Sequence, residues 1–202
     1  MQDLLNFFAA AVMAIFIENT IFTRALGTSR MLAVAKSPKM TFAFGISITI
    51  VTTVSGSLAW LCNLYLKTLS FRYYIEPLVN VVILTVVYLV FCILCLLIFP
   101  KFYKRMKHVL TLAVFNCATL GALLLPAHNS VTMAESRLST WVGFSFGTGI
   151  AFLMATILVS EGMRKLEASN VPKAFKGLPA TLIYIGILSL AFYGLIGHEL
   201  PF

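Results

Sequence analysis

The stretch 16–36 reads FIENTIFTRALGTSRMLAVAK, and the rest of the chain is organised around it. It begins inside an apolar run, yet it carries Glu18, Asn19 and Arg24 before a break of sequence LGTSR at 26–30. Charged and amide side chains are costly close to hydrocarbon, so they usually face a protein interior, a water-filled cavity or a partner. A break at membrane depth is tolerated only where protein or a cavity satisfies the freed backbone groups. The stretch therefore predicts a polar site inside a membrane-spanning region.

The composition indicates a helical membrane protein. The chain is 60% hydrophobic and only 11% charged, with a mean hydropathy of +0.96. A helix needs about 20 apolar residues to cross a bilayer. Six stretches have that length, and the last five contain no Asp, Glu, Lys or Arg: Leu4–Thr23, Thr41–Leu66, Pro77–Pro100, Val109–Ala127, Leu138–Ser160 and Gly177–Gly197.

The basic residues predict the orientation, because cytoplasmic loops carry an excess of Lys and Arg. Loops one, three and five hold ten of them: Lys36, Lys39, Lys101, Lys104, Arg105, Lys107, Arg164, Lys165, Lys173 and Lys176. The opposite side holds Lys67, Arg72 and Arg137. We therefore expect both termini to lie outside, and the net charge of +8 is explained by topology rather than by a nucleic-acid partner.

Two halves of similar plan divide the single expected membrane domain, 1–202. The repeats 1–100 and 101–202 would each hold three helices and enter the membrane from opposite sides, which is the pattern of an inverted repeat. Such repeats place sites where interrupted helices meet near the midplane. The counterpart of the first break is predicted in helix four, at 115–121 (FNCATLG), which contains Asn116 and Cys117.

Other motifs point to no autonomous enzyme. The chain shows no Ser/His/Asp set, no phosphate-binding glycine loop and no carboxylate pair. Cys92 and Cys95 form a C-x-x-C pair on one helix face. Its apolar flanks favour two small hydrophobic residues over a redox or metal site, and its role stays open.

Three segments resemble a known family. FIENTIFTRALGTSRMLAVAK is similar to the first-helix signature of the six-helix subunits of bacterial Rnf and Na+-pumping NADH:quinone oxidoreductase (Nqr) complexes, and VFNCATLGALLL resembles their second signature. The C-terminal NVPKAFKGLPATLIYIGILSLAFYGLIG resembles the Rnf A and Nqr E type more than the sister Rnf E/Nqr D type.

This resemblance implies a subunit of the bacterial cytoplasmic (inner) membrane that pairs with an inverted Rnf E/Nqr D-type sister and with other complex subunits. Such complexes couple electron transfer, from ferredoxin or NADH, to Na+ or H+ transport. The resemblance also implies a [2Fe–2S] cluster between the sisters, with two cysteines from each. Cys117 matches one of these cysteines, but the other position is occupied by Ser29.

Ser29 leaves three possibilities open, because Fe–S clusters are ordinarily held by thiolates. The cluster is bound with a Ser29 alkoxide, is bound by other ligands, or is absent. Arg30 adds a positive charge that would stabilise an anionic ligand or a reduced cluster, or would replace the cluster's role. Without a cluster, the chain would be a diverged paralogue.

Two further alternatives remain. Glu18 and Asn19 match the polar pair before the family's break. One interpretation is that they line a midplane site or an ion path. The other is that Glu18 forms a purely structural pair with Arg24. The protein as a whole is a complex subunit, a stand-alone secondary transporter with interrupted helices, or a structural membrane subunit.

Overall fold

Seven α-helices make up the described part of the computed structural model, which covers residues 2–35, 37–69, 71–98, 100, 103, 107, 111, 114–128, 137–168, 172 and 174–196. They are α1 (Gln2–Phe16), α2 (Thr28–Val34), α3 (Pro38–Leu66), α4 (Arg72–Ile98), α6 (Cys117–His128), α7 (Leu138–Ala168) and α8 (Leu178–Ile196). By length and composition α3, α4 and α7 can cross a membrane, and α1, α6 and α8 are shorter apolar helices. The expected all-helical membrane protein is confirmed at this level.

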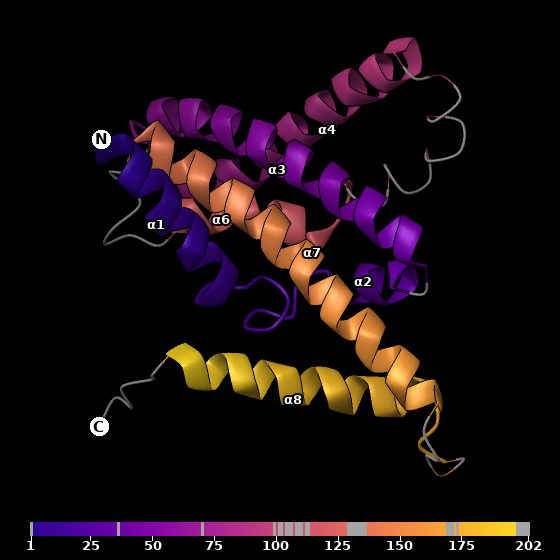
Figure 1. The fold of residues 1–202 in the computed structure, drawn as a ribbon. Coiled ribbons are helices and arrows are strands. Elements are labelled where there is room, and N and C mark those ends of the chain that lie inside the picture. The colour runs from indigo at the N-terminus through magenta and orange to yellow at the C-terminus, as the bar shows by residue number, and fades with distance from the viewer. Residues whose placement is uncertain are drawn as a thin grey trace, which may run out of the picture.

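Helix α7 is the centre of the molecule, with α1 and α3 packed along it (Figure 1). Its glycines make this packing close. A β-carbon added to Gly143 or Gly147 would collide with the backbone of α1, and one added to Gly149 would collide with Thr49 of α3. Small residues let membrane helices approach in this way. These glycines therefore allow α1 and α3 to pack closely against α7.

The short helix α2 is fixed to the same framework. Met31 is fully buried, and the Ser160 hydroxyl of α7 donates a 2.7 Å hydrogen bond to the Ala35 carbonyl just after α2. Helix α8 meets the rest of the protein at fewer points and lies near the C-terminal end of α7 (Figure 1). The Phe192 ring of α8 also stacks on that of Phe22, with the ring centres 4.6 Å apart. Both α2 and α8 are thus held in place by contacts with α7.

Several boundaries differ from the sequence prediction. The first helix was expected to reach Thr23 but ends at Phe16, and the third was expected to begin at Pro77 but begins at Arg72, with the proline inside its second turn. The last-but-one helix runs beyond Ser160 to Ala168. The expected limits at Val109 and Gly197 lie outside the described residues, as do five of the basic residues used for orientation: Lys36, Lys101, Lys104, Arg105 and Lys173.

Candidate functional site

The chain leaves α1 because Asn19 replaces helical hydrogen bonds with bonds of its own. The Asn19 side chain is fully buried. Its Nδ2 donates to the Ile15 carbonyl at 2.8 Å, and its Oδ1 accepts from the amides of Ile21 (3.0 Å) and Phe22 (3.1 Å). Asparagine side chains compete with the helix ladder in this way. Asn19 therefore stabilises the backbone of the first interruption, and its role in an ion path stays a prediction.

The first interruption occupies residues 17–27, so it is longer and begins earlier than the break predicted at 26–30. Ala25 (φ 55°) and Gly27 (φ 81°) adopt left-handed backbone conformations, which turn the chain into α2. Thr28, Ser29 and Arg30 were expected in the break but form the first turn of α2. The prediction missed this because hydropathy cannot show where side-chain hydrogen bonds divert a backbone.

The second interruption is shorter than predicted. The backbone bends at Phe115 and Asn116, and α6 begins at Cys117, so the remainder of the expected break at 115–121 is helical. Asn116 Oδ1 accepts from the Ala118 amide at 3.4 Å. The Thr119 hydroxyl lies 2.6 Å from both the Val114 and the Asn116 carbonyls, and donates to these acceptors across the bend.

The two interruptions pack directly against each other at a crossing formed by Leu26, Gly27, Asn116, Ala118 and Gly121. A β-carbon on Gly27 would lie 2.8 Å from Asn116 Oδ1 and 3.1 Å from the Ala118 β-carbon. One on Gly121 would lie 2.6 Å from Leu26 Cδ1. Segments almost ninety residues apart in sequence thus meet in one place, which is the juxtaposition that the sequence predicted for a shared site.

A charged pair lies at the start of the first interruption. Arg24 donates to Glu18 Oε2 from Nη2 at 2.6 Å and from Nε at 3.1 Å. The Glu18 side chain is 16% exposed and that of Arg24 is 44% exposed. The pairing of these residues is therefore real, and whether it also serves ion transport remains a prediction.

Ser29, Arg30 and Cys117 are exposed on the surface of this chain. Ser29 lies two residues beyond Gly27, and Cys117 lies between Asn116 and Ala118, two of the residues that Gly27 approaches. Cys117 also borders an open groove of about 240 Å³ beside α4, together with Val81 and Leu84. These residues are accessible to a partner rather than enclosed in the fold.

The donor set does not fit an ordinary iron–sulfur cluster. Cys117 offers one free thiol, and Ser29 offers a hydroxyl, whereas such clusters take four thiolates or a thiolate and imidazole set. Among the described residues no three His, Cys, Asp or Glu side chains gather as metal ligands. For a cluster shared between two sister subunits, this chain therefore offers one thiolate fewer than the resemblance implies.

Two buried polar atoms near the crossing lack hydrogen-bond partners within the described part of the chain. They are Thr20 Oγ1 and Asn116 Nδ2. Buried polar atoms are nearly always paired with protein or water. Thr20 and Asn116 can therefore each form a further hydrogen bond, with water or with a group from a partner.

Sequence reasoning missed Glu76. It was placed ahead of a helix beginning at Pro77, but the structure buries it at 2% exposure within α4. Asn80 follows one turn later on the same face, also buried. This spacing of two polar residues in an apolar helix was the available signal.

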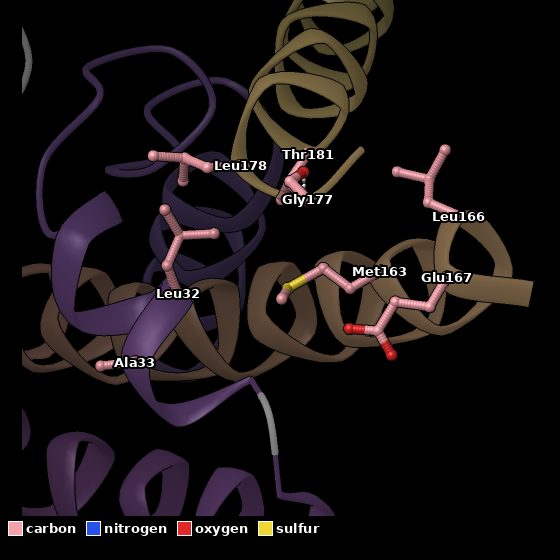
Figure 2. A pocket seen from close by; sticks show the side chains of 8 residues that line it. All are labelled: Leu32, Ala33, Met163, Leu166, Glu167, Gly177, Leu178 and Thr181. Carbon is pink, nitrogen blue, oxygen red and sulfur yellow. Dashed lines mark hydrogen bonds between the residues drawn. The ribbon is translucent and has the colours of Figure 1, made fainter. Parts of the chain in front are cut away.

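A separate cavity lies at the other end of α7 from Trp141. It has a volume of about 310 Å³ and is formed where α2, the C-terminal part of α7 and the start of α8 meet (Figure 2). Its walls include Leu32, Met163 and Leu178, with Glu167 as the charged side chain. None of the residues predicted for the site contributes to this cavity, so it is not the expected site.

The C-x-x-C pair is also separate. Cys92 and Cys95 are free, half-buried thiols in α4. A packing role and any other function of this pair both stay predictions.

Residues 7–198 match the family described as Rnf-Nqr subunit, membrane protein. The chain is 27% identical, over 94% of its length and 96% of the relative, to the A subunit of the Na(+)-translocating ferredoxin:NAD(+) oxidoreductase complex of Acetobacterium woodii. It is 28% identical to the A subunit of the ion-translocating oxidoreductase complex of Actinobacillus pleuropneumoniae serotype 5b, over 90% of this chain and 91% of the relative. It is also 28% identical to the E subunit of the Na(+)-translocating NADH-quinone reductase of Proteus mirabilis, over 96% of this chain and 99% of the relative. The chain therefore belongs to the Rnf-Nqr family of membrane subunits, and within it to the Rnf A/Nqr E type.

Proposed function

We propose that this chain is a non-autonomous membrane subunit of an Rnf/Nqr-like translocase that couples electron transfer, from ferredoxin or NADH, to Na+ or H+ transport. The names of its relatives support this assignment. The observation that carries it is the contact of the two interruptions through Gly27 and Asn116, with Glu18, Arg24 and Cys117 beside it. Interrupted helices that meet in this way are typical of ion-transport sites.

Affinity purification from native membranes tests the assignment. The tagged chain should bring down flavin-bearing and other complex subunits, and vesicles with the complex should transport ions when supplied with an electron donor. A chain that purifies alone and transports an ion without electron transfer would be a stand-alone secondary transporter. A chain that purifies with partners, but whose deletion leaves ion transport intact, would be a structural subunit.

The topology that we propose is six spans in two inverted halves, with both termini outside the bacterial cytoplasmic membrane. Three long and three shorter apolar helices support it, together with the charge distribution of the loops. A membrane-impermeant maleimide should label a Gln2→Cys variant in intact cells, and should label Lys176→Cys only after permeabilisation. The natural cysteines supply the background, and the reverse pattern would invert the topology.

The exposed polar residues beside the crossing support an Rnf E/Nqr D-type sister subunit as the direct partner. Arg24, Ser29, Arg30 and Cys117 are exposed in this chain. Leaving arginines exposed to hydrocarbon is expensive, and a protein partner removes that cost. A photo-crosslinker at Arg30 should therefore capture the sister subunit, whereas one on the lipid-exposed face of α4, at Leu89, should not.

The state of the iron–sulfur site is decided by spectroscopy. The complex, purified without oxygen and reduced with dithionite, should be compared by EPR with its Cys117→Ala variant. Loss of a [2Fe–2S]-type signal in the variant would make Cys117 a ligand, completed by Ser29 or a substitute. A signal in both would belong to another subunit. With Ser29 in place of a thiolate, absence of any such signal would identify a diverged, cluster-less paralogue.

A further inference from the structure

The cavity between α2, α7 and α8 is separate from the crossing of the interruptions. Its volume of about 310 Å³ is at the lower end of the range of small-ligand pockets. Its lining is mostly apolar and includes Leu32 of α2, Met163 of α7 and Leu178 of α8 (Figure 2). The cavity therefore has the size and the walls to hold the polar end of an amphiphilic molecule.

Two polar side chains also line this cavity. Glu167 lies one turn after Met163 on the same face of α7 (Figure 2). From α8, the buried Thr181 hydroxyl donates a 3.0 Å hydrogen bond to the Gly177 carbonyl, so the hydroxyl oxygen can still accept a bond. A carboxylate and a hydroxyl oxygen in one cavity favour a ligand with a positively charged N–H donor.

Glu167 is available for such a ligand. Arg164 precedes it by one turn, but the Arg164 guanidinium forms an ion pair with Glu161 at 2.7 Å. In the part of the chain that the structure describes, Glu167 itself forms no ion pair. Its side chain is exposed at the cavity, so a ligand can reach it.

The cavity lies where the apolar parts of α7 and α8 give way to charged residues. Charged residues begin on α7 at Glu161, and the last one before α8 is Lys176. Such a change indicates the boundary between hydrocarbon and water. Lys176 is exposed and directly precedes Gly177, which lines the cavity. Because Lys176 is next to the cavity, it can bind a phosphate there.

A second, apolar cavity of about 330 Å³ adjoins the first at Leu166, which lines both. It follows α8 for two turns, past Ile183 and Ile187. Both isoleucines are exposed in this chain. The second cavity therefore offers an acyl chain a path from the charged boundary into the hydrocarbon.

We propose that these adjoining cavities bind a bilayer phospholipid whose headgroup carries a primary ammonium, namely phosphatidylethanolamine. The ammonium donates to Glu167 and Thr181, the phosphate lies beside Lys176, and an acyl chain follows α8. Phosphatidylglycerol has no cation for Glu167, and phosphatidylcholine has no N–H donor. The proposal concerns lipid binding alone, so it does not depend on the electron-transfer function.

Native mass spectrometry of the purified chain in detergent tests the proposal. The chain is titrated with phosphatidylethanolamine, phosphatidylcholine and phosphatidylglycerol that have identical acyl chains. We expect Kd for phosphatidylethanolamine to be about 5-fold lower than for the other two, the range of an exposed ion pair. Glu167→Gln should raise the Kd for phosphatidylethanolamine to that for phosphatidylcholine. Lys176→Gln should weaken all three lipids by a similar factor, because they share the phosphate.

The matched controls are Asp3→Asn and Lys107→Gln. Asp3 is an exposed carboxylate paired with Arg137, just before the other end of α7, and Lys107 is an exposed lysine that precedes α6. Both variants should keep the wild-type affinities and the preference for phosphatidylethanolamine.

Three results would overturn the proposal. The first is a wild-type chain that shows no preference for phosphatidylethanolamine over the other two lipids. The second is a preference that survives in Glu167→Gln. The third is binding of none of the lipids, which would indicate that Glu167 instead receives a basic side chain of a partner subunit. Glu167 and Lys176 are both exposed, so their substitution leaves the packed core intact.

Discussion

Gly27 lies in contact with Asn116, so that a β-carbon on the glycine would come within 2.8 Å of the asparagine Oδ1. This contact joins the first interruption to the second and fixes how the two halves of the chain meet. It also depends on the smallest side chain at a backbone position with φ of 81°. The contact is therefore sensitive to a single added methyl group.

Gly27→Ala should destabilise the protein, because the left-handed conformation costs an alanine about 1–2 kcal/mol before the collision with Asn116 is added. Gly186→Ala in α8 is the matched control. No atom lies within 4 Å of a β-carbon at Gly186, and alanine is favoured over glycine inside helices. Chemical or thermal unfolding should show opposite signs for the two variants. Equal stability of Gly27→Ala and wild type would show that the crossing can open without cost.

Asn19→Ala should cost about 2–4 kcal/mol, since it leaves two buried amides and one carbonyl without their side-chain partner. The control is Thr85→Ala, which removes an exposed hydroxyl bonded only to the carbonyl of its own helix. That substitution should stay within about 0.5 kcal/mol of wild type. Unfolding in denaturant measures both. A small effect for Asn19→Ala would mean that α1 simply extends past Phe16.

Gly147→Ala should weaken the α1–α7 interface by about 1–3 kcal/mol, the usual cost of overpacking. The reason is that the new β-carbon would collide with the backbone at Ala11. Gly194→Ala, where no atom lies within 4 Å of the β-carbon, provides the comparison. Thermal unfolding should separate the two variants. If they behave alike, α1 can move away from α7 freely.

Glu18→Gln should abolish ion transport in vesicles of the assembled complex if Glu18 lies on the ion path. The structural alternative is the ion pair with Arg24, and it makes a different prediction. In that case the double variant Glu18→Gln/Arg24→Gln should recover transport, because no charge is left unpaired. Normal pumping by the single variant would exclude the transport role.

The ion pair of Asp3 and Arg137 should give a pH-dependent contribution to stability. Arg137 donates a 3.0 Å hydrogen bond to Asp3, and this bond lowers the pKa of the Asp3 carboxyl. Because the pKa is lowered, the pair stabilises the folded state at pH values above the carboxyl's ordinary pKa near 3.8. This contribution is lost as the pH falls through the lowered pKa. The Tm difference between wild type and Arg137→Gln should be small at pH 7 and vanish in acid.

High salt should also reduce this difference, because both side chains are exposed and the interaction is screened. A difference that grew as the pH fell would contradict the assigned pairing.

Apolar length alone predicted much of the fold. Helix α3 was expected over 41–66 and is observed as Pro38–Leu66, and α8 begins within one residue of its expected start. Long uncharged apolar segments leave the backbone little alternative to helix in a membrane. The ends of α1 and α4 were less predictable, because they depend on the side chain of Asn19 and on burial of Glu76.

The candidate site was predicted in part. The sequence pattern identified the two segments that meet in the structure. The reason is that a break in a membrane helix is costly unless other protein groups satisfy the backbone groups that it frees. The pattern could not show that Asn19 is used up in bonds to its own backbone, nor that Cys117 opens a helix. These details depend on tertiary contacts, which a pattern of residue types does not contain.

The bare glycine surfaces of α7 have a mechanical consequence. At Gly143 and Gly147 the backbone of α1 lies directly against α7, and at Gly149 Thr49 of α3 does the same, with no α7 side chain between them at these three points. Sliding of α1 or α3 along α7 would bring larger residues of α7 against these points, so we expect the three helices to move together. Any alternating movement during a transport cycle should be sought in the more loosely attached helices, α4 and α8.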